Sequence, residues 1–256
     1  VTPTLQIQEN HKYGDRLHTM ATLRYSSGLK NCPPSDMYIS LVGMTGWHEL
    51  GRRLSSLTPA VIKPASRGRV TLRNADKNIR PLIEFNFQSD DRDRIRLKEA
   101  VRRAAEILLS EQVSGLWHHA FPVVHAHRMR QLNDVTAFNS LRAKILAKLL
   151  DILPKAGRPV VGSLSKPNLD IATLIADEER LNEFVSESVT GMAHHVGTCR
   201  MGTFTDPMVV VDSSARVRGI KDLRVIDASI MPDIPRANTN IPTIMLAEKL
   251  ASNILK

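Results

Sequence analysis

Short β-prone runs separated by turn residues constrain the fold of this chain most strongly. The runs cover residues 19–25, 37–42, 69–73 and 82–87. Gly, Asn and Pro residues punctuate the segments between them, which is typical of antiparallel strands rather than of βαβ units. The pattern therefore predicts a mainly antiparallel sheet. It also predicts a hairpin with one buried face between residues 61–64 and the run R-G-R-V-T-L that starts at Arg67.

Helical patterns follow the strands. Ser89 and Asp90 are candidate N-caps of a first helix, because their side-chain oxygens can accept hydrogen bonds from the first turn. Its apolar face is predicted from residues at roughly helical spacing: Ile95, Val101, Ala105 and Leu108. A later helix over residues 178–189 is predicted to pack through Leu181, Phe184 and Val185. Together these patterns indicate an α+β fold with the helices on one side of the sheet.

Another helix is predicted over residues 139–153, ending before Pro154 and Gly157. Its predicted apolar stripe consists of Leu141, Ile145, Leu149 and Ile152. The basic residues that accompany the stripe are Arg142, Lys144 and Lys148. A basic amphipathic helix can bind a membrane surface or a partner, but a solvated basic face is more common and is our interpretation.

The composition is that of an ordinary globular protein, with 42% hydrophobic and 24% charged residues. The net charge of +9 suggests nucleic-acid binding as one hypothesis. However, basic residues are mixed with acids, and no helix-turn-helix or aromatic-rich RNA motif is visible. We therefore expect no nucleic-acid partner. No apolar run approaches the ~20 residues of a membrane span. The two cysteines, Cys32 and Cys199, favour a reducing, cytoplasmic location over a disulfide framework.

The character of the chain changes at Gly191. A glycine-punctuated loop leads into two Val/Ile-rich runs predicted as strands, 209–211 and 223–226, and then into a final helix that starts near Pro242. We therefore predict a substrate-binding domain over residues 1–190 and a separate C-terminal segment over 191–256. The chain also opens without a methionine, a strand or a helix cap, which we interpret as the start of a fragment.

The loop M-A-H-H-V-G-T-C-R-M-G at residues 192–202 is the first segment that suggests chemistry. A histidine before a Gly-Thr turn lies outside helix and strand ladders, and its charge changes near neutral pH. The adjacent histidines His194 and His195 also suggest a metal site as an alternative. A zinc site needs further ligands at suitable spacing, and neither Cys199 nor the pair His118 and His119 completes a recognisable set. No metal is therefore expected.

Two more segments have functional potential. The apolar run Leu-Arg-Val-Ile ends at Asp227 and Ala228, and such strand ends often face a ligand in α/β folds. A simple exit from strand to turn explains the same residues equally well. Asn238 and Asn240 precede Pro242 and predict a capped helix start. The exposed N–H groups and positive dipole of such a start favour electron-rich or anionic ligands, unless the asparagines act only as caps.

Together these segments resemble the C-terminal signature of the glucose–methanol–choline (GMC) oxidoreductases. The matching elements are His-x-Val-Gly-Thr-Cys-Arg-Met-Gly, Val-Val-Asp, Leu-Arg-Val-Ile-Asp-Ala-Ser and an Asn before the last helix. Upstream, P-A-S-R-G-R-V-T-L from Pro64, I-E-F-N-F from Ile83 and D-D-R-D from Asp90 resemble the substrate domain of that family. The resemblance covers most of the chain from about Tyr25 and is weakest between residues 112 and 178.

The resemblance implies two catalytic positions. His194 corresponds to the family histidine that faces the flavin and acts on the alcohol proton. His195 stands where relatives usually carry proline or a small residue, and we interpret it as a polar or supporting loop residue. The second catalytic position, a His or Asn in the family, falls on Asn238, with Asn240 as the competing assignment.

The resemblance also implies contacts with FAD. Asp227 and Ala228 match family residues near the ribityl and pyrophosphate groups, whereas Asn240 and Ile241 match backbone that approaches the isoalloxazine ring. Residues 191–256 are accordingly expected to complete an FAD-binding α/β domain.

The implied activity is oxidation of a small-molecule alcohol to a carbonyl, with hydride passing to the flavin and His194 accepting the proton. Family members begin with a strand, a GxGxxG turn and a helix that hold the pyrophosphate. No GxGxxG occurs in this sequence. We therefore expect the N-terminal part of the FAD-binding domain to be absent, and the chain to be inactive without that missing half as its partner.

Other activities stay open at this point. The family includes flavin-bearing lyases that act on cyanohydrins, and flavin reduction by an alcohol would separate a hydroxynitrile lyase from an alcohol dehydrogenase or oxidase. A non-catalytic binding module could keep the same fold without flavin. An upstream GxGxxG would argue for the enzyme, and its absence would argue for the module.

Overall fold

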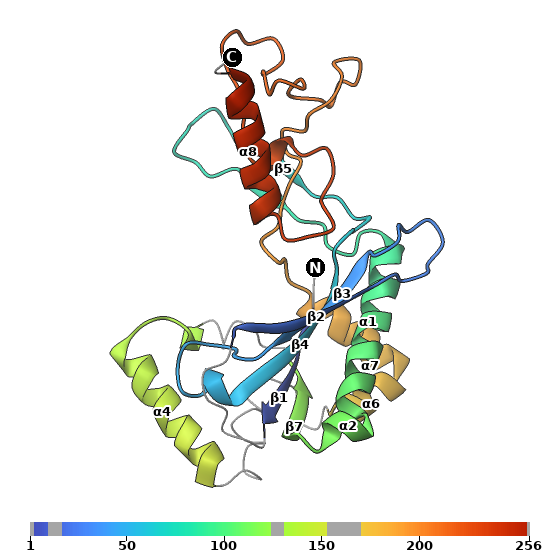
Figure 1. The fold of residues 1–256 in the computed structure, drawn as a ribbon, viewed down its shortest axis with the longest axis vertical. Coiled ribbons are helices and arrows are strands. Elements are labelled where there is room, and N and C mark those ends of the chain that lie inside the picture. Colours follow the sequence, from blue (N-terminus) through green and yellow to red (C-terminus); the bar gives the residue numbers. More distant parts are fainter. Residues whose placement is uncertain (1–2, 10–16, 124–130, 153–169, 255–256) are drawn as a thin grey trace. The chain divides into compact units, whose positions relative to one another are not determined.

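A computed structural model of the chain describes residues 3–9, 17–123, 131–152 and 170–254 (Figure 1). The chain divides into two compact units, each built from two segments: residues 1–61 with 90–190, and residues 62–89 with 191–256. The predicted boundary at Gly191 coincides with a change of unit. Residues 62–89 differ from the expectation, because they group with the C-terminal segment and not with the rest of 1–190. The roles of the two parts in binding substrate and FAD stay predictions.

The first unit contains a five-stranded, wholly antiparallel sheet of order β2-β3-β4-β1-β7. Its strands are β1 (Leu5–Glu9), β2 (Thr19–Tyr25), β3 (Met37–Val42), β4 (Leu54–Val61) and β7 (Trp117–Pro122). The 3₁₀ helix η1 (Gly51–Arg53) leads into β4. The runs predicted at 19–25 and 37–42 are confirmed as β2 and β3. Because β4 already pairs with β1 and β3, the predicted hairpin from residues 61–64 is wrong.

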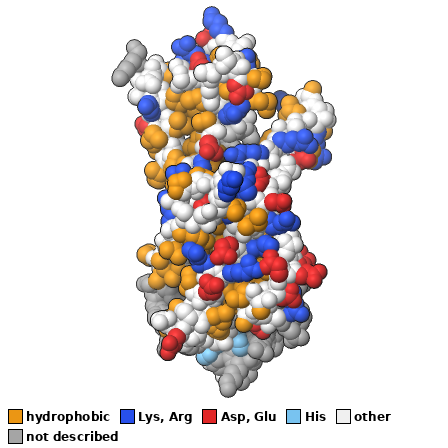
Figure 2. All heavy atoms as spheres, turned by 90° about the vertical axis from the view of Figure 1, so that its right-hand side faces the viewer, with side chains coloured by type: hydrophobic (Ala, Val, Ile, Leu, Met, Phe, Trp, Pro, Cys, Tyr) orange, Lys and Arg blue, Asp and Glu red, His pale blue; other side chains and the backbone are white. Residues whose placement is uncertain are grey.

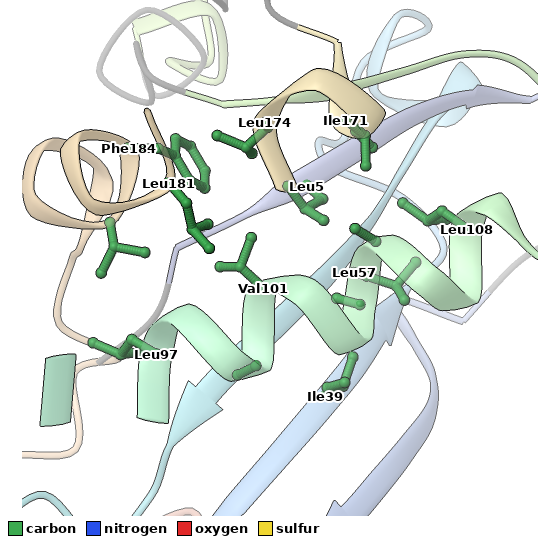
Figure 3. Packing of buried hydrophobic residues seen from close by; sticks show 14 of the residues in the cluster. Leu5, Ile39, Leu57, Leu97, Val101, Leu108, Ile171, Leu174, Leu181 and Phe184 are labelled. Carbon is green, nitrogen blue, oxygen red and sulfur yellow. The ribbon is translucent and has the colours of Figure 1, made fainter. Parts of the chain in front are cut away.

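One face of this sheet is covered by α1 (Asp91–Leu109), α6 (Ile171–Ala176) and α7 (Glu178–Ser188), while the short α2 (Glu111–Ser114) follows α1. Asp90 caps α1 as predicted, since its carboxylate accepts a hydrogen bond from the Arg92 N–H. Val101 of α1 lies among Leu5 of the sheet and Leu181 of α7 (Figure 3). Each such apolar side chain contributes about 1.5–3 kcal/mol when it leaves water. Ile95, predicted on the same face, is 46% exposed instead.

The opposite face of the sheet is covered by α4 (Ala137–Ile152), so the helices do not all lie on one side. Leu54 packs with Leu150 of α4, whereas Leu57, three residues further along β4, packs with α1. The predicted stripe of α4 is wrong: Leu141, Ile145, Leu149 and Ile152 are exposed. The buried face carries Asn139, Ala143, Ala147 and Leu150.

The orientation of α4 has a local cause. The Asn139 amide donates hydrogen bonds to the carbonyls of Gln131 (2.8 Å) and Asp134 (3.0 Å), which turns this side of the helix toward the chain that precedes it. The small side chains of Ala143 and Ala147 then let the helix approach closely. The predicted end of the helix at Pro154 and Gly157 lies outside the described residues.

A buried ionic cluster joins α1 to the sheet. Arg96 donates to Asp36 at 2.7 Å and to Asp93 at 2.5 Å, and all three side chains are at most 1% exposed. The Ser27 N–H and hydroxyl donate to the same Asp36 carboxylate at 2.8 and 2.7 Å. Burial raises the pKa of Asp36, but the hydrogen bonds from Ser27 and Arg96 outweigh it and hold that pKa below its ordinary value.

The surface of α1 and α7 carries charges of both signs. Glu178 at the start of α7 forms ion pairs with Lys98 and Arg102 of α1. Figure 2 shows basic and acidic side chains intermingled over the face that carries these helices. The excess of positive charge is therefore diluted by acids on this face. Within the described ranges, no helix has both the length and the apolar character needed to cross a bilayer.

The first segment of the second unit forms a small antiparallel ribbon of β5 (Arg69–Thr71) and β6 (Leu82–Glu84). These strands are shorter than the predicted runs, and all three residues of β5 are exposed, which corrects the expected buried face. Gly68 directly precedes β5. A Cβ atom at this position would lie 2.3 Å from the Glu84 carbonyl oxygen, so the close approach of the backbones requires glycine.

The second segment contains the 3₁₀ helix η3 (Ala228–Ile230) and the final helix α8 (Asn240–Ile254). The strands predicted at 209–211 and 223–226 are not formed; the chain makes isolated bridges there, such as Val211 with Val217 and Arg216 with Arg224. The Asp212 carboxylate accepts hydrogen bonds from the N–H groups of Ser214 and Arg216, and these local turns replace a strand ladder.

α8 is anchored to its own segment through an apolar cluster. Leu250 is buried with Val211, Ala215 and Ile230, and Leu246 packs against them. The helix begins at Asn240, two residues before the predicted start at Pro242, because the Thr239 carbonyl already accepts the Thr243 N–H at 2.9 Å. Proline is tolerated at Pro242, since N–H groups of a first helical turn need no partner inside the helix.

Candidate active site

The loop that carries His194 runs beside the segment that carries Asp227. Three backbone hydrogen bonds join them: Gly197 N–H to the Ala228 carbonyl (3.4 Å), Cys199 N–H to Ser229 (2.9 Å) and Met201 N–H to Ile230 (2.8 Å). Gly197 has φ = +87°, a conformation that favours glycine. Two of the motifs found in the sequence therefore lie side by side.

Asp227 organises the turn that receives this loop. One carboxylate oxygen accepts both the Ser229 N–H at 2.8 Å and the Ser229 hydroxyl at 2.5 Å, which caps η3. Ala228 supplies a carbonyl to the His194 loop, as described above. These contacts are those of a local turn, with no strand before it in the described range 170–254, and contact of either residue with FAD stays a prediction.

The His194 ring reaches the start of α8. Its Nδ1 lies 3.3 Å from the Thr239 hydroxyl oxygen, and Thr239 is only 8% exposed. Thr239 lies between Asn238 and Asn240, so all three motifs converge within the second unit. Sequence reasoning missed Thr239 because a threonine between two asparagines carries no signal of its own; only its place inside the motif points to it.

The predicted residues at the start of α8 face solvent. Asn238 and Asn240 are exposed, and the Ile241 side chain is 71% exposed. His194 contacts the residue between the two asparagines, which leaves both as candidates for the second catalytic position. That the side chains of His194 and Asn238 face one substrate stays a prediction.

The surroundings of His194 favour its neutral form. Partial burial lowers its pKa below the ordinary value, and the neighbouring His195 acts in the same direction. The lowered pKa thus favours the uncharged ring at neutral pH, and an uncharged ring has a nitrogen able to accept a proton. A proton acceptor of this kind is what the oxidation of an alcohol requires.

His195 points to a different partner. Its ring lies 4.8 Å from the Phe85 ring, measured between centroids, at a tilt of 32°, and Phe85 stacks in turn on Phe87 at 5.1 Å. The same loop approaches Phe87 at Gly191, where an added Cβ would lie 3.1 Å from Phe87 Cζ. Sequence reasoning recognised I-E-F-N-F as a family element but assigned no contact to its phenylalanines.

The segment before α8 is tied to the start of the second unit. The Lys63 ammonium donates to the Asp233 carboxylate and, at 2.5 Å, to the Ile234 carbonyl. Burial raises the pKa of Asp233, but the hydrogen bonds from Lys63 and the Ile234 N–H, together with the charges of Lys63 and Arg67, outweigh it, so the net pKa is lowered. This contact restrains the chain a few residues before Asn238.

Among the residues that the structure describes, no three His, Cys, Asp or Glu side chains gather closely enough to hold a metal ion. His118 and His119 belong to β7 of the first unit, and the thiols of Cys32 and Cys199 are not bridged.

Comparison with known proteins identifies the family. The family model described as GMC oxidoreductase matches residues 64–247. The chain belongs to the GMC oxidoreductases. The match includes every site residue predicted from the sequence and joins both segments of the second unit.

Among characterised relatives, this GMC oxidoreductase is 34% identical over 236 residues to 5-(hydroxymethyl)furfural oxidase of Methylovorus sp. (strain MP688), which covers 91% of the chain and 36% of the relative. It is 32% identical over 193 residues to an oxygen-dependent choline dehydrogenase of Vibrio vulnificus (strain YJ016). This match covers 75% of the chain and 26% of the relative. The chain thus spans between about a quarter and about a third of the length of these relatives.

Solved structures share the fold of this GMC oxidoreductase. Pyridoxine 4-oxidase from Mesorbium loti superposes with a TM-score of 0.65 at 19% identity, covering 98% of this chain and 42% of that one. A formate oxidase from Aspergillus oryzae, solved to examine the effect of a mutation on FAD modification, superposes with a TM-score of 0.60 at 20% identity. The superposition covers 89% of this chain and 32% of the formate oxidase.

Proposed function

We propose that this chain is the catalytic, substrate-side portion of an FAD-dependent enzyme that oxidises an alcohol to a carbonyl. The observation that carries the proposal is the His194 Nδ1 atom at 3.3 Å from the hydroxyl oxygen of Thr239, the residue between Asn238 and Asn240. Choline, pyridoxine and 5-(hydroxymethyl)furfural, named in the relatives and the solved neighbour, each bear a hydroxyl group. An alcohol is therefore the substrate class that we assign.

The chemistry divides between the cofactor and the protein. FAD, when bound, takes up the hydride from the alcohol carbon. His194 accepts the hydroxyl proton, so that the substrate loses one proton and one hydride and leaves as a carbonyl compound. Asn238 is neutral and cannot act as a base, but its amide can donate a hydrogen bond that orients the substrate oxygen. Asn240 takes this part in the alternative assignment.

The residues at the start of α8 fit one side of a flavin. Asn240 and Ile241 lie at the positive end of a 15-residue helix, where backbone N–H groups favour electron-rich atoms. Ile241, Ile244 and Met245 form an apolar face of this helix that is at least 51% exposed at each residue. We infer that a nucleotide-binding part, with the GxGxxG turn that this sequence lacks, covers this face in the whole protein and holds FAD with Asp227 and Ala228.

The chain of 256 residues alone is expected to hold FAD weakly. Without a GxGxxG turn, no helix N-terminus of the usual kind binds the pyrophosphate, which is the main anchor of the cofactor. Absorbance of the purified protein, before and after incubation with FAD and gel filtration, should show far less than one flavin per chain. A yellow protein with stoichiometric flavin would contradict this prediction.

An alcohol is expected to reduce the flavin of the FAD-loaded protein that contains the nucleotide-binding part. Anaerobic mixing with 5-(hydroxymethyl)furfural, choline or pyridoxine should bleach the oxidised flavin spectrum and yield the aldehyde. Bound FAD that no alcohol reduces, together with cleavage of a cyanohydrin, would point to a lyase instead. A protein that binds no FAD in any form would point to a non-catalytic module.

A further inference from the structure

We propose that His195 is a positioning residue, whose ring contact with Phe85 holds the turn that presents His194 to Thr239. The inference rests on the proposed role of His194 as proton acceptor. It extends that role to the neighbouring residue of the same loop. All residues involved belong to the second unit.

The turn between Gly191 and His195 is strained at its centre. Ala193 has φ = +57°, a left-handed conformation that residues with a Cβ atom rarely adopt. Such residues persist where the surroundings over-determine them, and they cluster at functional sites. Ala193 directly precedes His194, so the strained conformation sets the direction in which the His194 ring leaves the backbone.

Two contacts outside the turn hold it in this conformation. On one side the His194 ring meets the Thr239 hydroxyl at 3.3 Å. On the other side the His195 ring packs on Phe85 at 4.8 Å between centroids. The two adjacent side chains thus contact different segments, His194 the start of α8 and His195 the residue after β6. A turn with another backbone conformation would direct the two rings away from these contacts.

The aromatic platform clamps both ends of the turn. Phe85 meets His195, and Phe87, stacked on Phe85, lies against Gly191, where a Cβ would approach Phe87 Cζ to 3.1 Å. Phe85 itself follows β6 directly, so the β5–β6 ribbon supports the platform. We therefore expect that an aromatic ring at position 195 is enough to support the turn, and that an imidazole is not required.

The test compares three variants of the FAD-loaded protein by the rate of flavin reduction at saturating alcohol. His195→Ala, which removes the ring, is expected to slow reduction about tenfold, as losses in supporting residues often do, with alcohol affinity within about twofold. His195→Phe keeps a ring without the imidazole and should stay within about threefold of the wild type. His118→Ala, an exposed histidine of the first unit, is the matched control and should change nothing.

A second substitution separates positioning from a general structural effect. Ala193→Gly added to His195→Ala gives the turn a residue that adopts positive φ without penalty. The double variant should therefore recover part of the lost rate. Because the rate is measured per bound flavin, in folded protein only, a role of His195 in folding alone predicts no loss of rate for the double variant to recover.

A readout without flavin or turnover completes the test. The ¹⁵N resonance of His194 Nδ1 reports its contact with Thr239 and should move toward that of a solvated histidine in His195→Ala, while His195→Phe should match the wild type. Equal spectra and rates for His195→Ala and the wild type would overturn the proposal, as would a failure of His195→Phe to retain the rate. If no alcohol reduces the wild-type flavin, the proposed function fails, and the resonance of His194 still decides the positioning role.

Discussion

Replacement of His194 by alanine is expected to slow flavin reduction by about 10²–10⁴-fold, the usual contribution of a general base. The affinity for the alcohol should change little, because the proton moves only in the transition state and not on binding. Anaerobic rapid mixing of the FAD-loaded protein with increasing alcohol concentrations separates the two quantities. The limiting rate reports the chemical step, and the half-saturating concentration reports binding.

The control for this substitution is His118→Ala, since His118 is exposed on β7 and belongs to the first unit. Its limiting rate should equal that of the wild type. A His194→Ala protein with a normal limiting rate and weakened alcohol binding would assign His194 to substrate binding and not to proton transfer. A larger loss in His195→Ala than in His194→Ala would mean that the catalytic histidine is His195.

The pH dependence of the wild type follows from the state of His194. Burial holds its pKa below the ordinary value of about 6.5. The ring is therefore a competent acceptor at neutral pH, and the limiting rate should be flat there. As the pH falls through the lowered pKa, the ring takes up a proton before the reaction and the rate should fall. The His194→Ala protein should lose this acid limb.

Replacement of Arg96 by methionine is expected to lower the free energy of unfolding by about 3–5 kcal/mol. The substitution keeps most of the apolar stem but removes the cation between Asp36 and Asp93, and both carboxylates are fully buried. A buried charge without a partner costs far more than the pair contributes. Urea unfolding, followed by circular dichroism, measures the change.

Arg94→Met is the matched control in the same helix. Arg94 pairs with Asp91 at 2.7 Å, but its side chain is 42% exposed and that of Asp91 is 79% exposed. Surface pairs of this kind contribute about 0–1 kcal/mol, so this variant should unfold close to the wild type. Equal losses in the two variants would show that helix composition, and not the buried cluster, determines the effect.

The loss in Arg96→Met should also depend on pH. The pKa of Asp36 is depressed in the folded wild type, so this group stabilises the fold above its unfolded pKa of about 4. That contribution disappears as the pH falls through the lower, folded value. In Arg96→Met the carboxylate has no cation and can be neutralised by a proton at a higher pH. The two proteins should therefore approach each other in stability as the solution becomes acidic.

The local elements that the sequence predicts well have local causes. β2 and β3 follow from short β-prone runs between turn residues, and Asp90 caps α1 because the cap needs only the next few residues. The stripe of α4 was mispredicted, because the amide bonds of Asn139 and two small alanines decide which side is buried. The hydrophobic periodicity of the sequence reports neither the hydrogen bonds of Asn139 nor the close packing that small side chains allow.

The residues of the candidate site also divide into those that a local motif reveals and those that only contacts between distant residues reveal. His194, Asn238 and Asp227 can be found from short motifs, since each motif lies in one stretch of chain. Thr239 and Phe85 cannot, because their contacts with His194 and His195 join residues 45 and 110 positions apart. The strain at Ala193 is likewise absent from any sequence pattern, since alanine has no preference for positive φ.

The division of the second unit into two distant segments has a consequence for biosynthesis. Residues 62–89 leave the ribosome before residues 90–190, yet they pack with residues 191–256. At about 5–20 residues per second, the roughly 100 intervening residues take on the order of 5–20 s to translate. Throughout that interval Val70, Ile83 and Phe85 lack the chain that completes their unit. A nascent polypeptide thus carries an apolar ribbon without its packing partner, and the second unit folds only after residues 191–256 have been synthesised.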